Sequence, residues 1–437
     1  MIAQASFLIL LTIAGFLAWK RFRFVRRNIL IGRDTPITGN AKDRWKTMLL
    51  VALGQGKMFS RPLAAVMHLF IYVGFVIINI EVIEILIDGI FGTHRILSFM
   101  GGLYDVLIGS FEILALLVIV ACVVFLARRN VLHLLRFRQR ELEGWPRTDA
   151  NVILIIEILL MSAFLTMNAA DGLLQMSGHV HYHDAGSFPV SRFVMPGLDG
   201  LSEGALVAVE RFCWWFHIAG ILAFIVYLTY SKHLHIILAF PNTWYSKLEP
   251  AGTFTNLDSV TREVKLMLDP QANPPSAAPA SDTPQRFGAR DVFDLSWVQL
   301  MNAYSCTECG RCTSECPANQ TGKLLSPRKI MMDTRDRLEE VGACMDQHGG
   351  VWQDDGKSLL RDYITEEELW ACTTCNACTQ ACPVNINPME IIVDLRRYLI
   401  MEESKSPESI TSMFNNIENN GAPWAMSPAE RGSWAVG

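Results

Sequence analysis

Two stretches of this sequence, CTECGRCTSECP at residues 306–317 and CTTCNACTQACP at residues 372–383, repeat a single pattern. Each reads C-x2-C-x2-C-x3-C-P, and together they use eight of the eleven cysteines. This is the spacing with which paired [4Fe-4S] clusters are held. Zinc sites use pairs of C-x2-C and do not require the C-x3-C-P ending, so zinc is the weaker interpretation. The pattern therefore predicts a protein that carries electrons.

The eight cysteines are expected to divide between two clusters, because the fourth cysteine of each run binds the cluster of the other run. The proline after that cysteine turns the chain away, so that the thiolate reaches the second site. The first cluster is assigned to Cys306, Cys309, Cys312 and Cys382. The second cluster is assigned to Cys372, Cys375, Cys378 and Cys316. Cys122 and Cys213 lie in apolar stretches and are expected to pack as small apolar residues.

The composition changes along the chain. Of the 437 residues only 19% are charged, whereas a soluble protein carries about 25%. Long apolar runs fill residues 1–240, and a membrane-spanning helix needs about 20 apolar residues. Five spans are predicted there, at Ile2–Trp19, Leu63–Ile87, Tyr104–Ala127, Val152–Met167 and Ala205–Tyr230. No basic patch interleaved with aromatic residues occurs, so nucleic acid is not expected as a partner.

The basic residues predict the orientation in the membrane. The loops after the first and third spans contain eleven and six lysines and arginines, whereas residues 88–103 and 171–204 contain little beyond Arg95 and Arg192. Loops rich in Lys and Arg stay in the cytoplasm. We therefore expect a multi-pass protein of the inner (cytoplasmic) membrane. Its N-terminus is predicted outside, and its cysteine-rich half in the cytoplasm, where thiolates stay reduced.

Histidines in the membrane half predict a haem b site. His217 and His235 are 18 residues apart, which is five helical turns, so they lie about 27 Å apart and cannot bind one haem. His68 follows Arg61 and His235 follows Lys232, and these cations mark the cytoplasmic surface. His68 and His235 are therefore the predicted axial ligands of one haem. A structural histidine is the alternative, although ionisable side chains within a membrane usually have a function.

A second site is expected in the outer half of the membrane, near His217. The second span has no histidine at that depth, so the site is either a second haem or a quinone site. Its predicted residues are His217, His94, Asn79 and Glu81. Quinone reduction also needs proton carriers. The membrane acids considered for that role are Glu81, Glu84, Asp88, Glu112 and Glu157. His233 is expected to face away from His235.

The predicted fold is all-α, with a five-helix transmembrane haem b domain followed by an α-helical ferredoxin domain that holds two [4Fe-4S] clusters. Residues 1–240 form the first domain, 241–290 a connecting segment, 291–405 the ferredoxin domain, and 406–437 a tail that contacts a partner. Residues 270–286 are rich in Pro, Ala and Ser, which predicts a flexible linker. Helices are predicted at Pro327–Gly342 and Pro388–Leu399, each with proline in the first turn.

The membrane half resembles the gamma subunit of respiratory nitrate reductase in its five helices, outer N-terminus and two histidines 18 residues apart, the second closing SKHLH at 231–235. That subunit has two histidines on its second helix, whereas this chain keeps only His68. The cysteine-rich half resembles the ferredoxin-like subunit of heterodisulfide reductase. Many fused relatives continue beyond GAPWAMSPAERGSW (residues 421–434 here) into a module with two CCG motifs. This chain has no CCG motif, which predicts a separate partner subunit with that iron–sulfur domain.

The fused arrangement is similar to membrane iron–sulfur oxidoreductases that connect electron-transfer flavoprotein with menaquinone. The resemblance implies an electron-transfer subunit of a membrane quinone oxidoreductase. Electrons would pass between a cytoplasmic donor or partner subunit, the two clusters, haem b and menaquinone or another quinone. Two alternatives stay open. The chain could oxidise quinol and supply a cytoplasmic disulfide or sulfur-compound reductase, or it could be a membrane-anchored structural iron–sulfur protein without haem.

Overall fold

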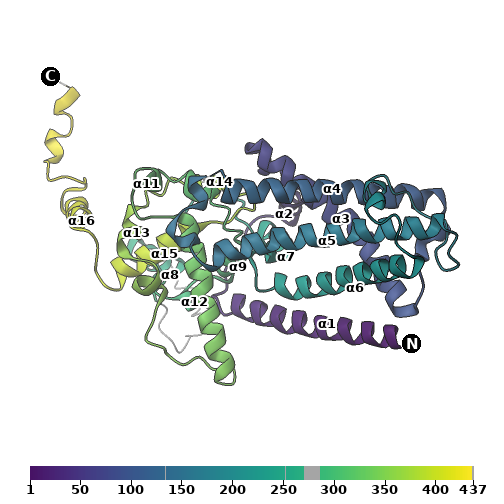
Figure 1. Ribbon diagram of the computed structural model, residues 1–437. Coiled ribbons are helices and arrows are strands. Elements are labelled where there is room, and N and C mark those ends of the chain that lie inside the picture. Colours follow the sequence, from purple (N-terminus) through teal and green to yellow (C-terminus); the bar gives the residue numbers. More distant parts are fainter. Residues whose placement is uncertain (133, 251, 270–285, 436–437) are drawn as a thin grey trace. The chain divides into compact units, whose positions relative to one another are not determined.

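The computed structural model describes residues 1–132, 134–250, 252–269 and 286–435 (Figure 1). Apart from Arg286, the predicted linker at residues 270–286 lies outside the described residues. In the described part of the chain the regular elements are helices, and pairing of extended segments is limited to two isolated β-bridges. The all-α fold class is therefore confirmed.

Five helices are long and apolar enough to cross a membrane, as predicted. They are α1 (Ile2–Ile29), α3 (Pro62–Phe91), α4 (Gly102–Asn130), α5 (Trp145–Met176) and α6 (Glu203–Leu228). The helices mostly extend beyond the predicted apolar spans, because polar and basic turns at their ends stay helical. The largest difference is in α5, which begins at Trp145 and continues to Met176.

Local sequence signals fix where these helices begin and end. Pro62 opens α3, where the missing N–H of proline costs no hydrogen bond. Gly92 ends α3 in the left-handed conformation at φ 73°, which glycine adopts without strain. Ser202 caps α6, and its side chain accepts a hydrogen bond from the Ala205 N–H at 3.3 Å.

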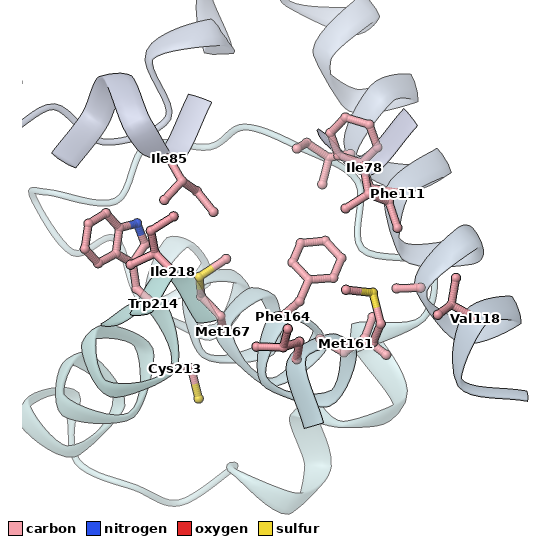
Figure 2. Packing of buried hydrophobic residues seen from close by; sticks show 14 of the residues in the cluster. Ile78, Ile85, Phe111, Val118, Met161, Phe164, Met167, Cys213, Trp214 and Ile218 are labelled. Carbon is pink, nitrogen blue, oxygen red and sulfur yellow. The ribbon is translucent and has the colours of Figure 1, made fainter. Parts of the chain in front are cut away.

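An apolar core holds the long helices together. In sequence order α3 packs on α4, α4 on α5, and α5 on α6 (Figure 1). Their buried side chains meet in one cluster, and Figure 2 shows Ile85, Phe111, Phe164 and Trp214 among them. The first helix joins through Phe7, whose ring centre lies 5.8 Å from that of Trp214. Gly89 of α3 allows this approach, because a Cβ there would stand 2.6 Å from the Phe7 ring.

The chain divides into two compact units. The first consists of Met1–Arg27, Ala41–Trp244 and Tyr304–Gly310, and we call it the membrane unit because it contains the five long helices apart from the last two residues of α1. The second consists of Asn28–Asn40, Tyr245–Ala303 and Arg311–Gly437. The short segment Tyr304–Gly310 carries Cys306 and Cys309, so two of the predicted cluster ligands belong to the membrane unit.

The second unit is built on two helices that pack against each other, α12 (Pro327–Gln347) and α15 (Pro388–Met401). Both were predicted, and both begin at the expected proline. Fully buried Arg337 of α12 is held by Asp291 at 2.8 Å and Asp355 at 2.6 Å, which satisfies its charge. The remaining α-helices of the described chain are α2 (Ala41–Met48), α7 (His235–Trp244), α8 (Asp258–Leu268), α9 (Trp297–Ser305), α10 (Arg311–Ser314), α11 (Pro317–Gln320), α13 (Glu366–Ala371), α14 (Ala377–Ala381) and α16 (Glu408–Asn420).

Candidate functional site

The two cysteine loops share one backbone conformation. In the first loop Glu308 and Gly310 have φ of 56° and 72°, and in the second loop Thr374 and Asn376 have φ of 55° and 61°. These residues occupy the same two positions of the repeated pattern. Positive φ is uncommon for residues other than glycine, so its recurrence indicates a shared structural requirement. Left-handed residues in such turns direct successive N–H groups inward, which suits an anionic, thiolate-bound cluster.

After each loop the chain forms a short helix that carries the third cysteine. Cys312 lies on α10 and Cys378 lies on α14, and these two helices pack against each other. The fourth cysteines, Cys316 and Cys382, stand in extended conformation after those helices. The repeat in the sequence is therefore a repeat of loop, short helix and extended turn.

In the second predicted cluster, the crossover cysteine interacts with two cysteines of the other run. The Cys316 thiol interacts electrostatically with those of Cys372 and Cys378, which belong to the other run. Burial raises the pKa of Cys372, and it raises the pKa of Cys378 to about 12. Buried thiols of this kind need a bound metal to become thiolates. The donor set therefore fits an iron–sulfur cluster, and the four-cysteine assignment with Cys375 stays a prediction.

The first predicted cluster draws its ligands from both units. Cys306 and Cys309 belong to the membrane unit, and Cys312 and Cys382 belong to the second unit, so this grouping stays a prediction. Backbone N–H groups already point at sulfur in the second unit. Ile386 N–H donates to Cys382 Sγ at 3.3 Å, and Thr374 N–H donates to Cys372 Sγ at 3.4 Å. Such bonds stabilise thiolates and tune the reduction potential of a cluster.

A site for a single metal ion would need a tighter grouping of ligands than the predicted clusters do. Within the described ranges, no three His, Cys, Asp or Glu side chains are grouped so that they could hold one metal ion. A cubane cluster makes no such demand, because each of its four thiolates binds a different iron atom.

His68 and His235 lie together in the membrane unit, with ring centres 6.5 Å apart. His68 Nδ1 bonds Gln55 Oε1 at 3.1 Å, and His235 Nδ1 bonds the Lys232 carbonyl at 3.1 Å. Both partners only accept, so each Nδ1 carries the proton and Nε2 is the nitrogen that would bind a metal. A metal about 2 Å from each nitrogen would set the ring centres roughly 6 Å apart, so the pair fits a haem iron.

The expectation that His233 faces away from His235 is wrong. The two rings are 5.4 Å apart and nearly perpendicular, and the Phe224 ring lies 5.4 Å from the His233 ring. Burial lowers the pKa of His233 to about 3, and the neighbouring imidazoles of His235 and His68 add to the shift. The His233 imidazole is therefore uncharged, and it packs beside the predicted haem ligands. It was misplaced because the chain forms a tight turn at Lys232–Leu234 before α7 begins, so α-helical spacing does not apply.

Lys232 connects the histidine segment with the first cysteine loop. Its ammonium group forms an ion pair with the Glu308 carboxylate and donates to the Pro146 carbonyl at 2.6 Å. Asp149 lies 3.9 Å away, and the Lys232 side chain is only 9% exposed. Both ends of this ion pair belong to the membrane unit. Sequence reasoning used Lys232 only as a surface marker and did not consider Glu308.

The residues predicted for the outer site bond to different partners in the structure. His217 is fully buried, its Nδ1 bonds the Leu160 carbonyl at 2.9 Å, and its Nε2 has no hydrogen-bond partner. His94 instead lies 3.5 Å from Asp171, and the Asn79 amide bonds its own helix at the Phe75 carbonyl. A buried nitrogen without a partner fits a metal or quinone ligand, so His217 stays a prediction for the second site.

A buried polar network centred on Arg95 occupies the far end of the membrane unit from His68, at the other end of α3. Arg95 bonds Asp171 at 2.6 Å, Asn168 at 2.9 Å and the Tyr104 hydroxyl at 3.2 Å. We call this set, with the carboxylates bonded to it, the Arg95 network. The sequence showed Arg95 only as a loop charge. Asn168 and Asp171, two polar residues at the end of a predicted apolar span, were the signal for it.

Comparisons with known proteins agree on the iron–sulfur part. Residues 305–386 match the 4Fe-4S dicluster domain family. The chain is 28% identical to the probable iron-sulfur-binding oxidoreductase FadF of Bacillus subtilis, over 93% of this chain and 57% of the relative. It is 26% identical to the EtfAB:quinone oxidoreductase of Syntrophomonas wolfei, over 88% of this chain and 52% of the relative.

A third relative matches a smaller share of the chain. It is a ferredoxin/F(420)H(2)-dependent CoB-CoM heterodisulfide reductase subunit of Methanosarcina acetivorans, 33% identical over 28% of this chain and 60% of the relative. The chain spans about half the length of FadF and of the EtfAB:quinone oxidoreductase. No solved structure matches the chain. The chain thus contains a [4Fe-4S] dicluster region and five helices long and apolar enough to cross a membrane, and it is similar to iron–sulfur oxidoreductases.

Proposed function

We propose that this protein transfers electrons between a partner on its cluster side and quinone in the membrane, through two [4Fe-4S] clusters and haem b. The observation that carries the proposal is the connection through Lys232. Glu308, which stands between the ligands Cys306 and Cys309, pairs with the Lys232 ammonium group. The carbonyl of the same lysine accepts the Nδ1 bond of His235. One residue thus contacts both predicted redox sites.

His68 and His235 would hold the haem, which supplies a one-electron couple at this end of the helices. The chain itself orients the ligands. Gln55 and the Lys232 carbonyl fix both imidazole rings, and His233 closes one side of the pair. At the clusters, four of the eight predicted cysteine ligands are buried and backbone N–H groups donate to Cys372 and Cys382, whereas Cys375 is exposed. These features favour rapid transfer with little rearrangement.

The relatives support the choice of quinone and partner. One is named EtfAB:quinone oxidoreductase, so by analogy an electron-transfer flavoprotein is the proposed donor and menaquinone or another quinone the proposed acceptor. Quinone would react in the outer half, near His217 and Glu81, where a second haem is the alternative occupant. The heterodisulfide reductase relative favours a second function, in which quinol oxidation supplies a disulfide reductase.

Optical spectra of the purified full chain test the proposal. We expect b-type haem bands after dithionite reduction, and their reoxidation when a short-chain menaquinone is added. His68→Ala and His235→Ala should each remove the same bands, because either loss leaves the iron with one axial ligand. His183→Ala, in an exposed loop, is the control and should leave the bands intact. Iron-loaded protein without b-type bands would instead support the structural iron–sulfur alternative.

A further inference from the structure

We propose that Glu81 is a proton-exchange site in the membrane interior, near the Arg95 network and toward the end of the helices opposite to His68. The inference rests on the proposed function in one respect, namely that the exchanged protons are those of quinone. It also specifies on which side of the membrane the protons are exchanged. They would be taken up or released at the end of the helices opposite to His68 and His235.

The first observation is the state of Glu81 itself. Its side chain is in the interior of the helix bundle, the residue is 3% exposed, and Oε2 has no hydrogen-bond partner. Buried polar atoms are normally bonded, so an orphaned carboxyl oxygen requires an explanation. Within a membrane such an acid is costly and is usually retained for function. An unpaired oxygen on a carboxyl group is also what a proton donor or acceptor needs.

The neighbouring acids differ, because their oxygens are already occupied. Glu84 accepts from the Leu97 N–H at 2.9 Å and from the Tyr104 hydroxyl at 3.0 Å. Asp88 accepts from the Arg95 N–H at 2.8 Å. These two carboxylates therefore fix the loop after α3, which is a structural role.

Glu112 of α4 is occupied in the same way. One of its oxygens accepts from Asn168 at 3.1 Å, and the other accepts from the Val190 and Ser191 N–H groups at 2.8 and 3.0 Å. Glu81 faces this set, since its strongest charge interactions are with Arg95, Glu84 and Glu112. Among these four acids, Glu81 is the one with an unpartnered buried oxygen.

The Arg95 network provides the electrostatic surroundings of Glu81. Glu84 lies one helical turn from Glu81, and the Tyr104 hydroxyl can both accept and donate a proton. Arg95 cannot release its proton, so its role is to hold Tyr104 and Asp171 and to stabilise negative charge. Beyond Asp171 the network reaches His94, whose side chain is 24% exposed. The bonded network thus runs from Glu84 to a half-buried imidazole, and its part is to fix the charges near Glu81.

The stoichiometry of quinone reduction determines how many protons this site would exchange. Reduction of one quinone takes up two electrons and two protons and yields a neutral quinol, and oxidation of quinol releases both. Electrons would travel through the haem toward the cysteine loops. Protons would be exchanged at Glu81. Quinone turnover would then consume or release protons at the outer face.

A labelling experiment tests the site without any turnover. Dicyclohexylcarbodiimide, an apolar reagent for buried carboxyl groups, is applied to the full chain in detergent, and adducts are located by mass spectrometry. We expect an adduct at Glu81 and none at Glu84 or Glu112, whose oxygens are engaged. Glu81→Gln should lose the adduct at unchanged iron content. An adduct at Glu84 in place of Glu81, or none at all, would overturn the proposal.

A vesicle experiment tests the side of the membrane. The full chain is reconstituted with an entrapped pH dye, duroquinol is added, and external ferricyanide accepts electrons only from molecules whose cysteine-rich part faces outward. The vesicle lumen should acidify as ferricyanide is reduced. Glu81→Gln should slow both signals about tenfold or more, as expected for loss of a proton-transfer group.

Glu203→Gln, an exposed acid at the same end of the helices, is the matched control and should acidify the lumen at the wild-type rate. Acidification of the outer medium, or an unchanged rate in Glu81→Gln, contradicts the proposal. Failure of duroquinol to reduce the protein at all would instead count against the quinone function. The labelling result would then still decide the role of Glu81.

Discussion

At the scale of single residues, Lys232 is the connection most open to test. It is buried, and its replacement by glutamine would remove the ammonium group that pairs with the Glu308 carboxylate, which stands between Cys306 and Cys309. Negative charge near a cluster disfavours its reduced form. A change of about 1 kcal/mol corresponds to roughly 40 mV for a one-electron couple. We expect Lys232→Gln to lower the midpoint potential of that cluster by tens of millivolts, measured by redox titration with electron paramagnetic resonance.

Lys232→Arg is the conservative control, because it keeps the charge and can still pair with Glu308. It should restore a potential close to that of the wild type. A structural role alone would lower cluster content in both variants and leave the potential of the remaining clusters unchanged. Equal potentials in all three proteins would therefore refute the electrostatic connection.

Asp333 gives a pH dependence in an accessible range. Burial raises its pKa to about 7 despite the Lys329 ammonium group 2.6 Å away, and the Glu368 and Asp336 carboxylates add to the shift. Because the folded-state pKa lies above the ordinary 3.8, the stabilising contribution is complete below pH 3.8 and is lost as the pH rises through about 7. Between pH 5.5 and 7 the loss is at most about 2 kcal/mol.

We therefore expect Asp333→Asn to lose less thermal stability than the wild type between pH 5.5 and pH 8. The apparent unfolding midpoint of the full chain, measured anaerobically at both pH values, checks this. Asp346→Asn is the control, since that residue is exposed on the same helix and is not among the groups that shift the pKa of Asp333, and it should behave like the wild type. Parallel pH profiles for wild type and Asp333→Asn would show that the group is ionised throughout.

At the scale of elements, the cysteine loop is the unit that repeats. Gly310 has φ of 72° in the first loop, and alanine in that conformation costs about 1–2 kcal/mol. We expect Gly310→Ala to disturb the loop and to lower bound iron from about eight atoms per chain toward four, because one cluster would be lost. Iron and sulfide assays on anaerobically purified protein measure this.

Gly322 supplies the matched control. Its φ is 82°, so alanine there meets similar backbone strain, yet it lies outside both loops with open space around it. Gly322→Ala should keep about eight iron atoms. If both variants lose iron equally, general destabilisation rather than loop geometry is responsible.

Element types could be predicted because each leaves a local signal. Apolar runs identified five spans, prolines marked the starts of α12 and α15, and the cysteine spacing identified the cluster loops. Contacts between distant segments leave no such signal. Nothing in the sequence around Glu308 indicates a pairing with Lys232, and Arg95 reads as an ordinary loop charge. His233 was misplaced for the same reason, since an α-helical period was applied to residues that form a tight turn.

At the scale of the whole molecule, charge decides the orientation. The loops after the first and third spans contain eleven and six basic residues, and moving that much positive charge across a bilayer is strongly disfavoured. We expect protease added to intact spheroplasts to remove a tag fused before Met1 and to spare the cysteine-rich part. In inverted membrane vesicles the result should reverse. Cleavage of the cysteine-rich part in spheroplasts would invert the orientation and place proton exchange through Glu81 in the cytoplasm.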